Sequence, residues 1–294
     1  MPNHPKQLRF IVSLLLVTLS TLPLMADKFV KDPEPAILEV RYTRHEVTDT
    51  TKRDSRFFDE ETRLRIGNTK SLFCSVQHMW RDSIMAVDPS TYWEMERASF
   101  EKDPREHDRT ALQRSGRYWC TIYKNYPEGK LTETAYFDME YWKYVEDWEK
   151  PSWEITDDTK DILGYQCFKA ETDYRGRHWT AWFTPEIPIE EGPWKLCGLP
   201  GLILEAYDPH HDYSFTANAV FTNPTLQVGY LGYKDRRGYS NVTHDKFFNN
   251  WWKYKNSNFA AKISAAFGVG PKTTTTKKSV PNYDKEETDY PHDL

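Results

Sequence analysis

The sequence predicts a mainly β protein of the α+β class: a single curved antiparallel sheet, or half-barrel, with a few packed helices. Three observations predict it. Segments with apolar residues at alternate positions recur along the chain, which is the period of half-buried strands. Turn signals separate several of these segments, as in antiparallel hairpins. A helical repeat of aromatic residues occurs near the C-terminal end, from Thr243 to Phe267.

The first 26 residues predict a cleaved secretory signal. Lys6 and Arg9 form a basic region, Phe10 to Met25 is an almost unbroken apolar run, and Ala26 is a small residue at the predicted cleavage site. The run is shorter than the roughly 20 residues that span a bilayer, which favours a signal over a transmembrane anchor. No cysteine follows the run to carry a lipid. We therefore expect a mature chain that is soluble or peripheral, and periplasmic or otherwise exported to the cell envelope.

The mature chain has the size of one large domain. It retains 294 − 26 = 268 residues, and no Gly/Ser- or Pro-rich linker divides residues 27–270. Residues 271–294 are rich in Thr, Lys, Asp and Glu, which predicts a disordered tail. Loss of two signal cations changes the formal net charge from −5 to −7. Because the remaining basic residues are dispersed among acidic ones, the composition argues against a nucleic-acid partner, which needs a clustered basic face.

Five segments in the first half of the mature chain are predicted strands, because apolar and polar residues alternate along them. A turn signal at Gly67-Asn68 joins two of them into a hairpin. The stretch from Gln77 to Phe100 lacks the alternation and predicts short helices or a covering loop. The strand segments are Ala36–Val47, Thr62–Ile66, Ser71–Gln77, Gly116–Tyr123 and Lys130–Phe137.

The segment from Tyr165 to Thr184 predicts a hairpin residue by residue. Arg175-Gly176 forms a two-residue loop, and this loop fixes the register of both strands. One face is then apolar and the other is mostly polar, so we expect a sheet with one packed and one accessible face. The predicted cross-strand pairs are Tyr174–Arg177, Thr172–Trp179, Ala170–Ala181 and Phe168–Phe183.

The last predicted strand is Tyr213 to Phe221. A loop-like stretch follows, and aromatic residues then recur at helical spacing from Thr243 to Phe267. We expect one or two amphipathic helices here, with Thr243 as the N-terminal cap.

All four cysteines lie in the mature chain, and an even count in an oxidising compartment favours disulfides. Their spacing lacks the close Cys-x-x-Cys pairs of a zinc site, so neither a structural metal nor another cofactor is predicted. We favour the pairs Cys167–Cys197 and Cys74–Cys120, because each cysteine lies in a strand-like segment next to its partner in sequence order. Buried free thiols are the alternative.

A short motif then links the chain to a family. Pro200 and Gly201 predict a type II turn, and the strand Leu202 to Ala206 leaves it with both faces covered. The motif residues are Gly198, Leu199, Pro200, Gly201, Leu202 and Ile203.

These six residues are the namesake motif of the GLPGLI family of cell-envelope proteins from Bacteroidota, which this chain resembles. The resemblance extends from Leu163 to Ala206, through elements that follow the family's order. It implies an exported envelope protein and brings with it no established activity and no catalytic residues.

Two histidine groups are candidate sites. His210 and His211 lie between Asp208 and Asp212, a set that could bind a divalent metal. Because neighbouring residues on a strand point to opposite faces, a polar turn is the favoured interpretation. His178 is expected opposite Asp173, an arrangement used in acid–base catalysis. A surface cross-strand pair is favoured there, since no nucleophile motif accompanies it.

Clustered tryptophans are the third candidate. They could line a surface for sugar stacking or lipid binding, with Trp182 beside His178 in the hairpin, or they could form the core, which we favour. The residues are Trp142, Trp148, Trp153, Trp179, Trp182 and Trp194.

Two hypotheses about function follow. The first is a noncatalytic binding or carrier factor for an apolar ligand or an outer-membrane partner. The second is an envelope hydrolase with a site assembled from distant His and Asp or Glu residues. A polar cleft that gathers such residues supports the enzyme, and an apolar cavity without them supports the carrier.

Overall fold

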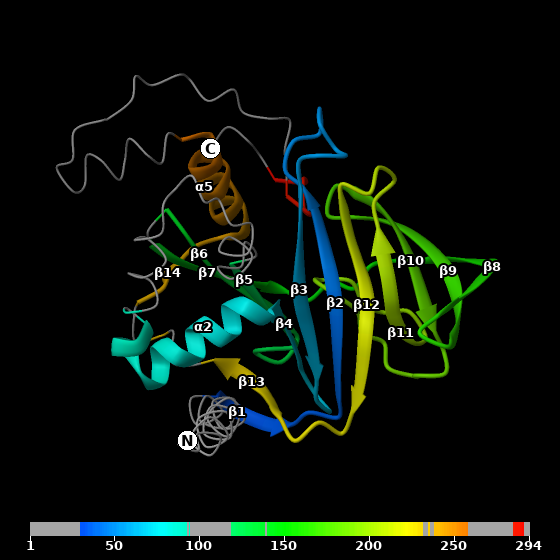
Figure 1. Cartoon of the computed structure of the whole chain (residues 1–294), viewed down its shortest axis with the longest axis horizontal. Helices are drawn as coiled ribbons and strands as arrows, with labels where there is room; N and C mark the ends of the chain where they lie inside the picture. The colour runs from blue at the N-terminus through cyan, green and yellow to red at the C-terminus, as the bar shows by residue number, and fades with distance from the viewer. Residues whose placement is uncertain are drawn as a thin grey trace, which may run out of the picture.

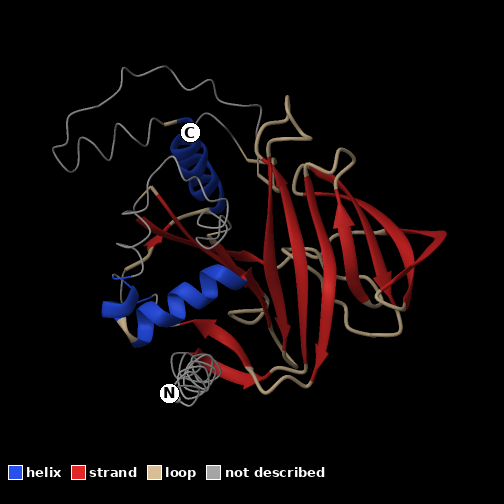
Figure 2. Ribbon diagram, in the orientation of Figure 1, coloured by secondary structure: helices blue, strands red, loops and turns tan. Residues whose placement is uncertain are grey.

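The computed structural model describes residues 30–92, 94, 119–138, 140–231, 235, 238–257 and 285–290. The predicted signal at 1–26 lies outside these residues, as does most of the predicted tail. Within them the protein is mainly β, as predicted (Figure 2). None of the helices in these ranges combines the length and the apolar character that crossing a membrane requires.

The strands and helices of the described residues include all the predicted strand segments and several strands that were not predicted, one of which, Gln227–Leu231, enters the stretch expected to be loop-like. They are β1 (Val30–Pro35), β2 (Leu38–Val47), β3 (Phe57–Ile66), β4 (Ser71–Ser75), α2 (Val76–Val87), β5 (Cys120–Lys124), β6 (Lys130–Phe137), β7 (Glu140–Asp147), β8 (Glu154–Ile162), β9 (Tyr165–Tyr174), β10 (Arg177–Thr184), β11 (Leu202–Tyr207), β12 (Tyr213–Thr222), β13 (Gln227–Leu231), β14 (Ser240–Asn241) and α5 (His244–Asn256).

One large sheet organises the molecule. Its twelve strands lie in the order β14-β7-β6-β5-β4-β3-β2-β12-β11-β10-β9-β8, and all neighbours are antiparallel except β14 and β7. The sheet curves strongly (Figure 1), so Arg175 in the β9–β10 turn reaches Glu146 on β7 at 2.8 Å. The prediction of a curved antiparallel sheet with packed helices is confirmed.

The two faces of the sheet have separate apolar clusters. The main core fills the inside of the curve, where α5 packs on β7 through contacts such as Phe247 with Tyr144 at 4.8 Å. A smaller cluster lies on the other face, where α2 and the pair β1–β13 cover β4 and β5. Its buried residues are Leu72, Cys74, Met79, Tyr123, Val228, Tyr230 and Leu231.

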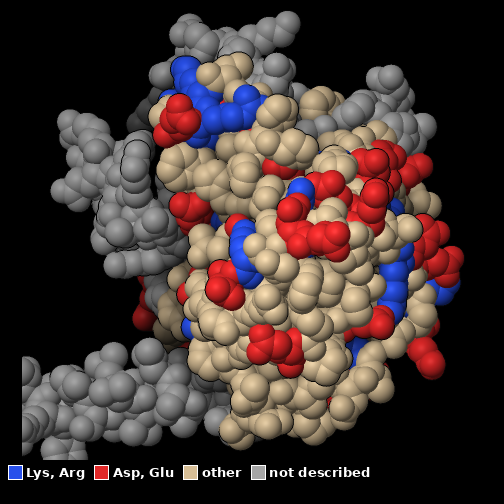
Figure 3. Space-filling model, turned by 90° about the vertical axis from the view of Figure 1, so that its right-hand side faces the viewer, with Lys and Arg blue, Asp and Glu red and all other residues tan. Residues whose placement is uncertain are grey.

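Strand β8 forms one edge of the twelve-stranded sheet and is strongly charged. Four of its acidic residues are exposed, and acidic side chains gather on this face of the molecule (Figure 3). Charged side chains at an edge disfavour pairing with a further strand. The exposed acids of β8 are Glu154, Asp157, Asp158 and Asp161.

The β9–β10 hairpin has the predicted register at every pair named above. Arg175 and Gly176 have φ of 55° and 76°, the positive values that a type I′ loop requires. The loop and the alternation of apolar residues were sufficient to fix the register because both act over neighbouring residues.

Both helices begin at residues with suitable caps. The Thr243 side chain accepts a hydrogen bond from the Lys246 amide, as predicted, and α5 begins at His244. It is described to Asn256, so the rest of the predicted helical stretch lies outside the described residues. The helix α2 begins at Val76, so the strand predicted over Ser71–Gln77 ends earlier, at Ser75, and the remainder of α2 lies in the stretch where short helices or a covering loop were expected.

The turn in the family motif differs from the prediction. The Leu202 amide donates to the Ile187 carbonyl at 3.0 Å instead of back to Leu199, and Gly201 has φ of 154° where a type II turn needs about +80°. The reason is packing against β10, because a Cβ on Gly201 would overlap the Thr184 carbonyl oxygen. The strand that leaves the turn is buried on both faces, as predicted.

The predicted disulfides are absent, and all four cysteines are buried free thiols. Cys74 lies opposite Thr121, so the adjacent Cys120 points to the other face of the sheet and cannot reach it. Cys167 lies in β9 beside β8, whereas Cys197 lies in the loop before β11, where its backbone forms an isolated β-bridge with Glu191. Sequence order was a poor guide because it ignores the face to which each thiol points.

Candidate functional site

The predicted His178–Asp173 pair forms on the accessible face of the hairpin. Its Nδ1 and Oδ1 atoms are 2.9 Å apart, and the side chains are 43% and 89% exposed. This is the surface pair that the favoured interpretation describes.

The His210-His211 turn is also exposed, and its flanking carboxylates have other partners. Asp208 accepts hydrogen bonds from Arg177 at 2.8 Å and from the Tyr213 amide at 2.9 Å. Asp212 accepts from Arg53 Nε at 2.6 Å. These arginines already pair with the carboxylates that a metal ion would need as ligands.

Tyr207 connects two of the predicted site residues. His211 stacks on its ring at a centroid distance of 4.2 Å, and the Trp182 indole donates to its hydroxyl at 3.4 Å. The side chain of Trp182 is itself buried, like those of Trp179 and Trp194. The other three clustered tryptophans pack against the same core, so their packing matches the core interpretation.

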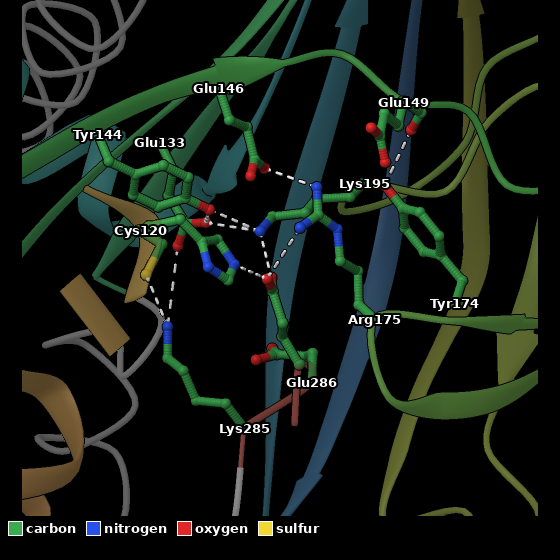
Figure 4. A network of polar contacts seen from close by, with 12 residues as sticks. Cys120, Glu133, Tyr144, Glu146, Glu149, Tyr174, Arg175, Lys195, Lys285 and Glu286 are labelled. Atoms are coloured by element: carbon green, nitrogen blue, oxygen red, sulfur yellow. Dashed lines mark hydrogen bonds and ion pairs between the residues drawn. The ribbon is translucent and has the colours of Figure 1, made fainter. Parts of the chain in front are cut away.

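The main convergence of ionisable groups lies elsewhere, inside the curve of the sheet (Figure 4). Segments far apart in the sequence meet there, including residues 285–290, which we name the tail segment. The participating residues are Glu133 on β6, Tyr144 and Glu146 on β7, Arg175 in the β9–β10 turn, Lys195 before β11, His244 on α5, and Lys285, Glu286 and Glu287 in the tail segment.

Lys195 is the centre of this network and is fully buried. Its Nζ donates to Tyr144 Oη at 2.6 Å and pairs with Glu133 at 3.2 Å and with Glu287. Burial acts to lower the pKa of Lys195, but Glu287 and Glu133 hold that pKa above its ordinary value. The ammonium group is therefore charged at neutral pH.

Glu287 is the main acidic partner. It contacts Lys195 and His244, and Arg175 lies 3.5 Å away. Burial acts to raise the pKa of Glu287, but Lys195 and His244 lower it to about 2. The carboxylate is thus ionised. Burial acts to lower the pKa of His244, but the contact with Glu287 outweighs burial and raises that pKa, which favours the protonated imidazole.

A second buried lysine positions the loop that carries Lys195. Lys124 on β5 donates to Glu191 at 2.6 Å and to the carbonyls of Gly192 and Leu196 at 2.8 and 3.2 Å. The loop before β11, which includes the start of the family motif, therefore folds around one buried ammonium group. This clamp directs Lys195 into the interior.

The tail segment is bound through both its side chains and its backbone. Arg44 donates to Glu286 at 2.9 and 2.5 Å, and Arg177 donates to the carbonyls of Lys285 and Glu286 at 2.7 and 3.3 Å. The tail expected at 271–294 is thus in ordered contact with the core over residues 285–290.

The chemistry of the network is that of ion pairing. Its charged groups are buried against opposite charges, and burial raises the pKa of the neighbouring Cys120 thiol to about 12. A nucleophile or general base must instead be available to a substrate. His244, Glu287 and Asp289 are near enough to share a metal, but Lys195 and Arg175 already place positive charge on Glu287.

Sequence reasoning missed this site for two reasons. Its residues come from segments up to about 150 positions apart, and only the fold brings them together. The tail also has the composition of a disordered segment. The sequence offers one signal that this part of the tail packs against the fold, namely an aromatic residue, Tyr290, three positions after two adjacent glutamates in an otherwise polar stretch.

Comparison with known proteins places a similarity in the central strands. Residues 126–225 match a family model described as N-glycanase peptide, N-terminal domain. No curated protein sequence matches the chain.

Two similar solved structures are crystal forms of PNGF-II. The P21 form has a TM-score of 0.47 and 14% identity, with 76% of this chain and 34% of that chain covered. The C2 form has a TM-score of 0.44 and 14% identity, with 71% and 31% covered. The chain thus spans about a third of the length of the solved structures it matches.

Proposed function

We propose that this chain is an exported, noncatalytic binding protein of the cell envelope, of the GLPGLI type, and that its ligand is a protein. One observation carries the proposal. The ionisable side chains that converge around Lys195 are buried and paired with opposite charges, which is the arrangement of a structural network.

The packing inside the sheet favours a protein partner over an apolar ligand. Trp194 and Leu196 from the loop before β11, Phe247 and Phe248 from α5, and Tyr290 all belong to the one core cluster. The inside of the curve is thus filled by the chain itself. A partner would contact the surface of the molecule or displace a segment of the chain from the inside of the curve.

Export rests on the basic and apolar regions of the first 26 residues. The resemblance to the GLPGLI family supports an envelope location. The family match covers residues 126–225, with a model described as N-glycanase peptide, N-terminal domain.

The same match favours one second candidate, an enzyme that acts on N-linked glycans. Its site would have to use groups outside the buried network, such as the exposed His178 or His210 and His211. This is the hydrolase hypothesis in its most specific form.

One experiment separates the candidates. The mature chain is incubated with a denatured glycoprotein that carries N-linked glycans, and released glycans are measured by mass spectrometry. We expect no release above a buffer control. Release that disappears in a His178→Ala or His210→Ala/His211→Ala variant would overturn the noncatalytic proposal.

Native mass spectrometry of the chain purified from envelopes tests the ligand class. We expect no bound lipid, together with a stoichiometric protein partner after cross-linking. A stoichiometric lipid would show that the protein is a carrier of an apolar ligand instead.

A further inference from the structure

The contacts of the tail segment have the pattern of peptide recognition. Its backbone is held at three residues, because Arg177 donates to two carbonyls and the Thr288 amide donates to the Arg175 carbonyl at 2.9 Å. The Thr288 hydroxyl also donates to the Gly176 carbonyl at 2.8 Å. Gly176 permits this approach, since a Cβ there would lie 2.7 Å from the Asp289 amide nitrogen.

The cations that hold the tail segment are each paired with a carboxylate of the main fold as well. The pairs are Arg44 with Glu46 at 2.7 Å, Arg175 with Glu146 at 2.8 Å, Arg177 with Asp208 at 2.8 Å, Lys195 with Glu133 at 3.2 Å, and His244 with Asp245 at 3.0 Å.

Because of this double pairing, each cation keeps a carboxylate partner when the tail segment leaves. The scaffold carboxylates orient the cations, and the remaining donors point to the tail segment. Prior orientation of this kind reduces the cost of binding. The tail segment itself supplies one residue, Tyr290, to the apolar core, and its departure would expose the paired cations together with aromatic side chains of α5.

Aromatic side chains of α5 complete the site. The Lys285 ammonium lies 5.2 Å from the Phe248 ring centroid and 5.3 Å from that of Trp251. Tyr290 stacks on Phe248 at 5.0 Å. The site thus recognises a cation, two carboxylates and an aromatic ring in a fixed order.

We propose that Arg44, Arg175, Arg177, Lys195 and His244 form a binding site, the tail site, for an acidic peptide of a partner protein. The tail segment is its internal occupant and competes with that partner. The proposal rests on the proposed binding function and names the class of ligand. The preferred sequence resembles Lys-Glu-Glu-Thr-x-Tyr, which residues 285–290 carry.

The test uses the full mature chain and a fluorescent peptide of residues 281–294, with binding measured by anisotropy. In the wild-type chain the tethered copy competes at an effective concentration on the order of millimolar. A Glu287→Gln substitution weakens that copy, so we expect the peptide to bind this variant at least about tenfold more tightly than the wild-type chain.

Matched controls isolate the role of Glu287. Asp289→Asn removes an exposed carboxylate of the same segment, and we expect this chain to bind the peptide as weakly as the wild type. A peptide with Glu287→Gln should lose its affinity for the Glu287→Gln chain. A Glu287→Gln chain that is folded, as judged by its circular dichroism spectrum, and binds no peptide would overturn the proposal.

A second measurement decides the matter if Glu287→Gln fails to fold. A specific protease site replaces Thr273–Thr276 in the full chain, and the folded protein is cut there. We expect excess labelled peptide to displace the cut tail. A cut tail that never exchanges would show that the segment is a permanent part of the fold. Either negative result leaves the noncatalytic assignment standing, because the glycan-release assay tests that separately.

Discussion

Two pairs of a histidine with a carboxylate lie in contrasting parts of this molecule. His178 and Asp173 are five residues apart on one hairpin, with side chains 43% and 89% exposed. His244 and Glu287 are 43 residues apart, and their side chains are 16% and 1% exposed. The first pair is exposed to solvent, whereas the carboxylate of the second pair also contacts the buried cations Lys195 and Arg175.

The contrast shows that the surroundings of a pair decide its role. Exposed ion pairs contribute about 0–1 kcal/mol, because water and salt screen them. Breaking a buried pair costs about 3–5 kcal/mol, since the remaining charge stays buried without its partner. The buried pair should therefore govern both the stability of the protein and the attachment of the tail segment.

The largest effect is expected for Lys195→Met. This change leaves Glu133 and Glu287 buried without their shared cation and should lower the free energy of unfolding by about 3–5 kcal/mol, measured in urea. Lys150→Met is the control, because Lys150 pairs with Glu190 on the surface. Its cost should stay below about 1 kcal/mol. Equal losses for the two variants would remove the distinction between buried and exposed pairs.

A glycine substitution tests the approach of the tail segment. Gly176 and Gly129 have φ of 76° and 74°, so alanine at either position carries a similar backbone strain of about 1–2 kcal/mol. Only Gly176 faces the tail segment, and nothing lies within 4 Å of a Cβ at Gly129. We expect Gly176→Ala to cost about 1–3 kcal/mol more than Gly129→Ala in thermal melts. Equal losses of stability for Gly176→Ala and Gly129→Ala would mean that the tail segment does not lie against Gly176.

The next effect is a dependence on pH. The pKa of Glu287 is depressed from 4.5 to about 2, so its stabilisation is present above pH 4.5 and is lost as the pH falls toward 2. The difference in melting temperature between the wild type and Glu287→Gln should shrink across this window. His244 has the opposite sign. Its raised pKa gives a contribution that is full below about pH 6.5 and lost as the pH rises through the raised value.

The smallest effect is expected for His178→Ala. The exposed pair with Asp173 should contribute less than about 0.5 kcal/mol, so the melting temperature should hardly change. A loss comparable to that of Lys195→Met would mean that this pair has a structural role which its exposure does not indicate.

The same contrast explains which features were predictable from the sequence. The register of the β9–β10 hairpin depends on the Arg175-Gly176 loop and on alternation within a few residues, and it was predicted correctly. The cap at Thr243 is equally local. The curvature that brings β7 to the β9–β10 turn depends on the whole sheet, and this long-range geometry creates the network.

The errors follow the same division. The disulfide prediction used distance along the chain and missed that Cys74 and Cys120 face opposite sides of the sheet. The type II turn was inferred from Pro200 and Gly201 alone, whereas contact with β10 sets the conformation. The composition of residues 271–294 also gave no indication that residues 285–290 pair with side chains from four other parts of the chain.

Hydrogen–deuterium exchange tests the central claim, that the tail segment occupies a site built by the main fold. In the wild-type chain we expect the peptide containing residues 285–290 to be protected, because the Thr288 amide is bonded to Arg175. In Glu287→Gln this protection should fall while the β9–β10 hairpin keeps its own. Exchange of the wild-type segment at the rate of a free peptide would contradict the account.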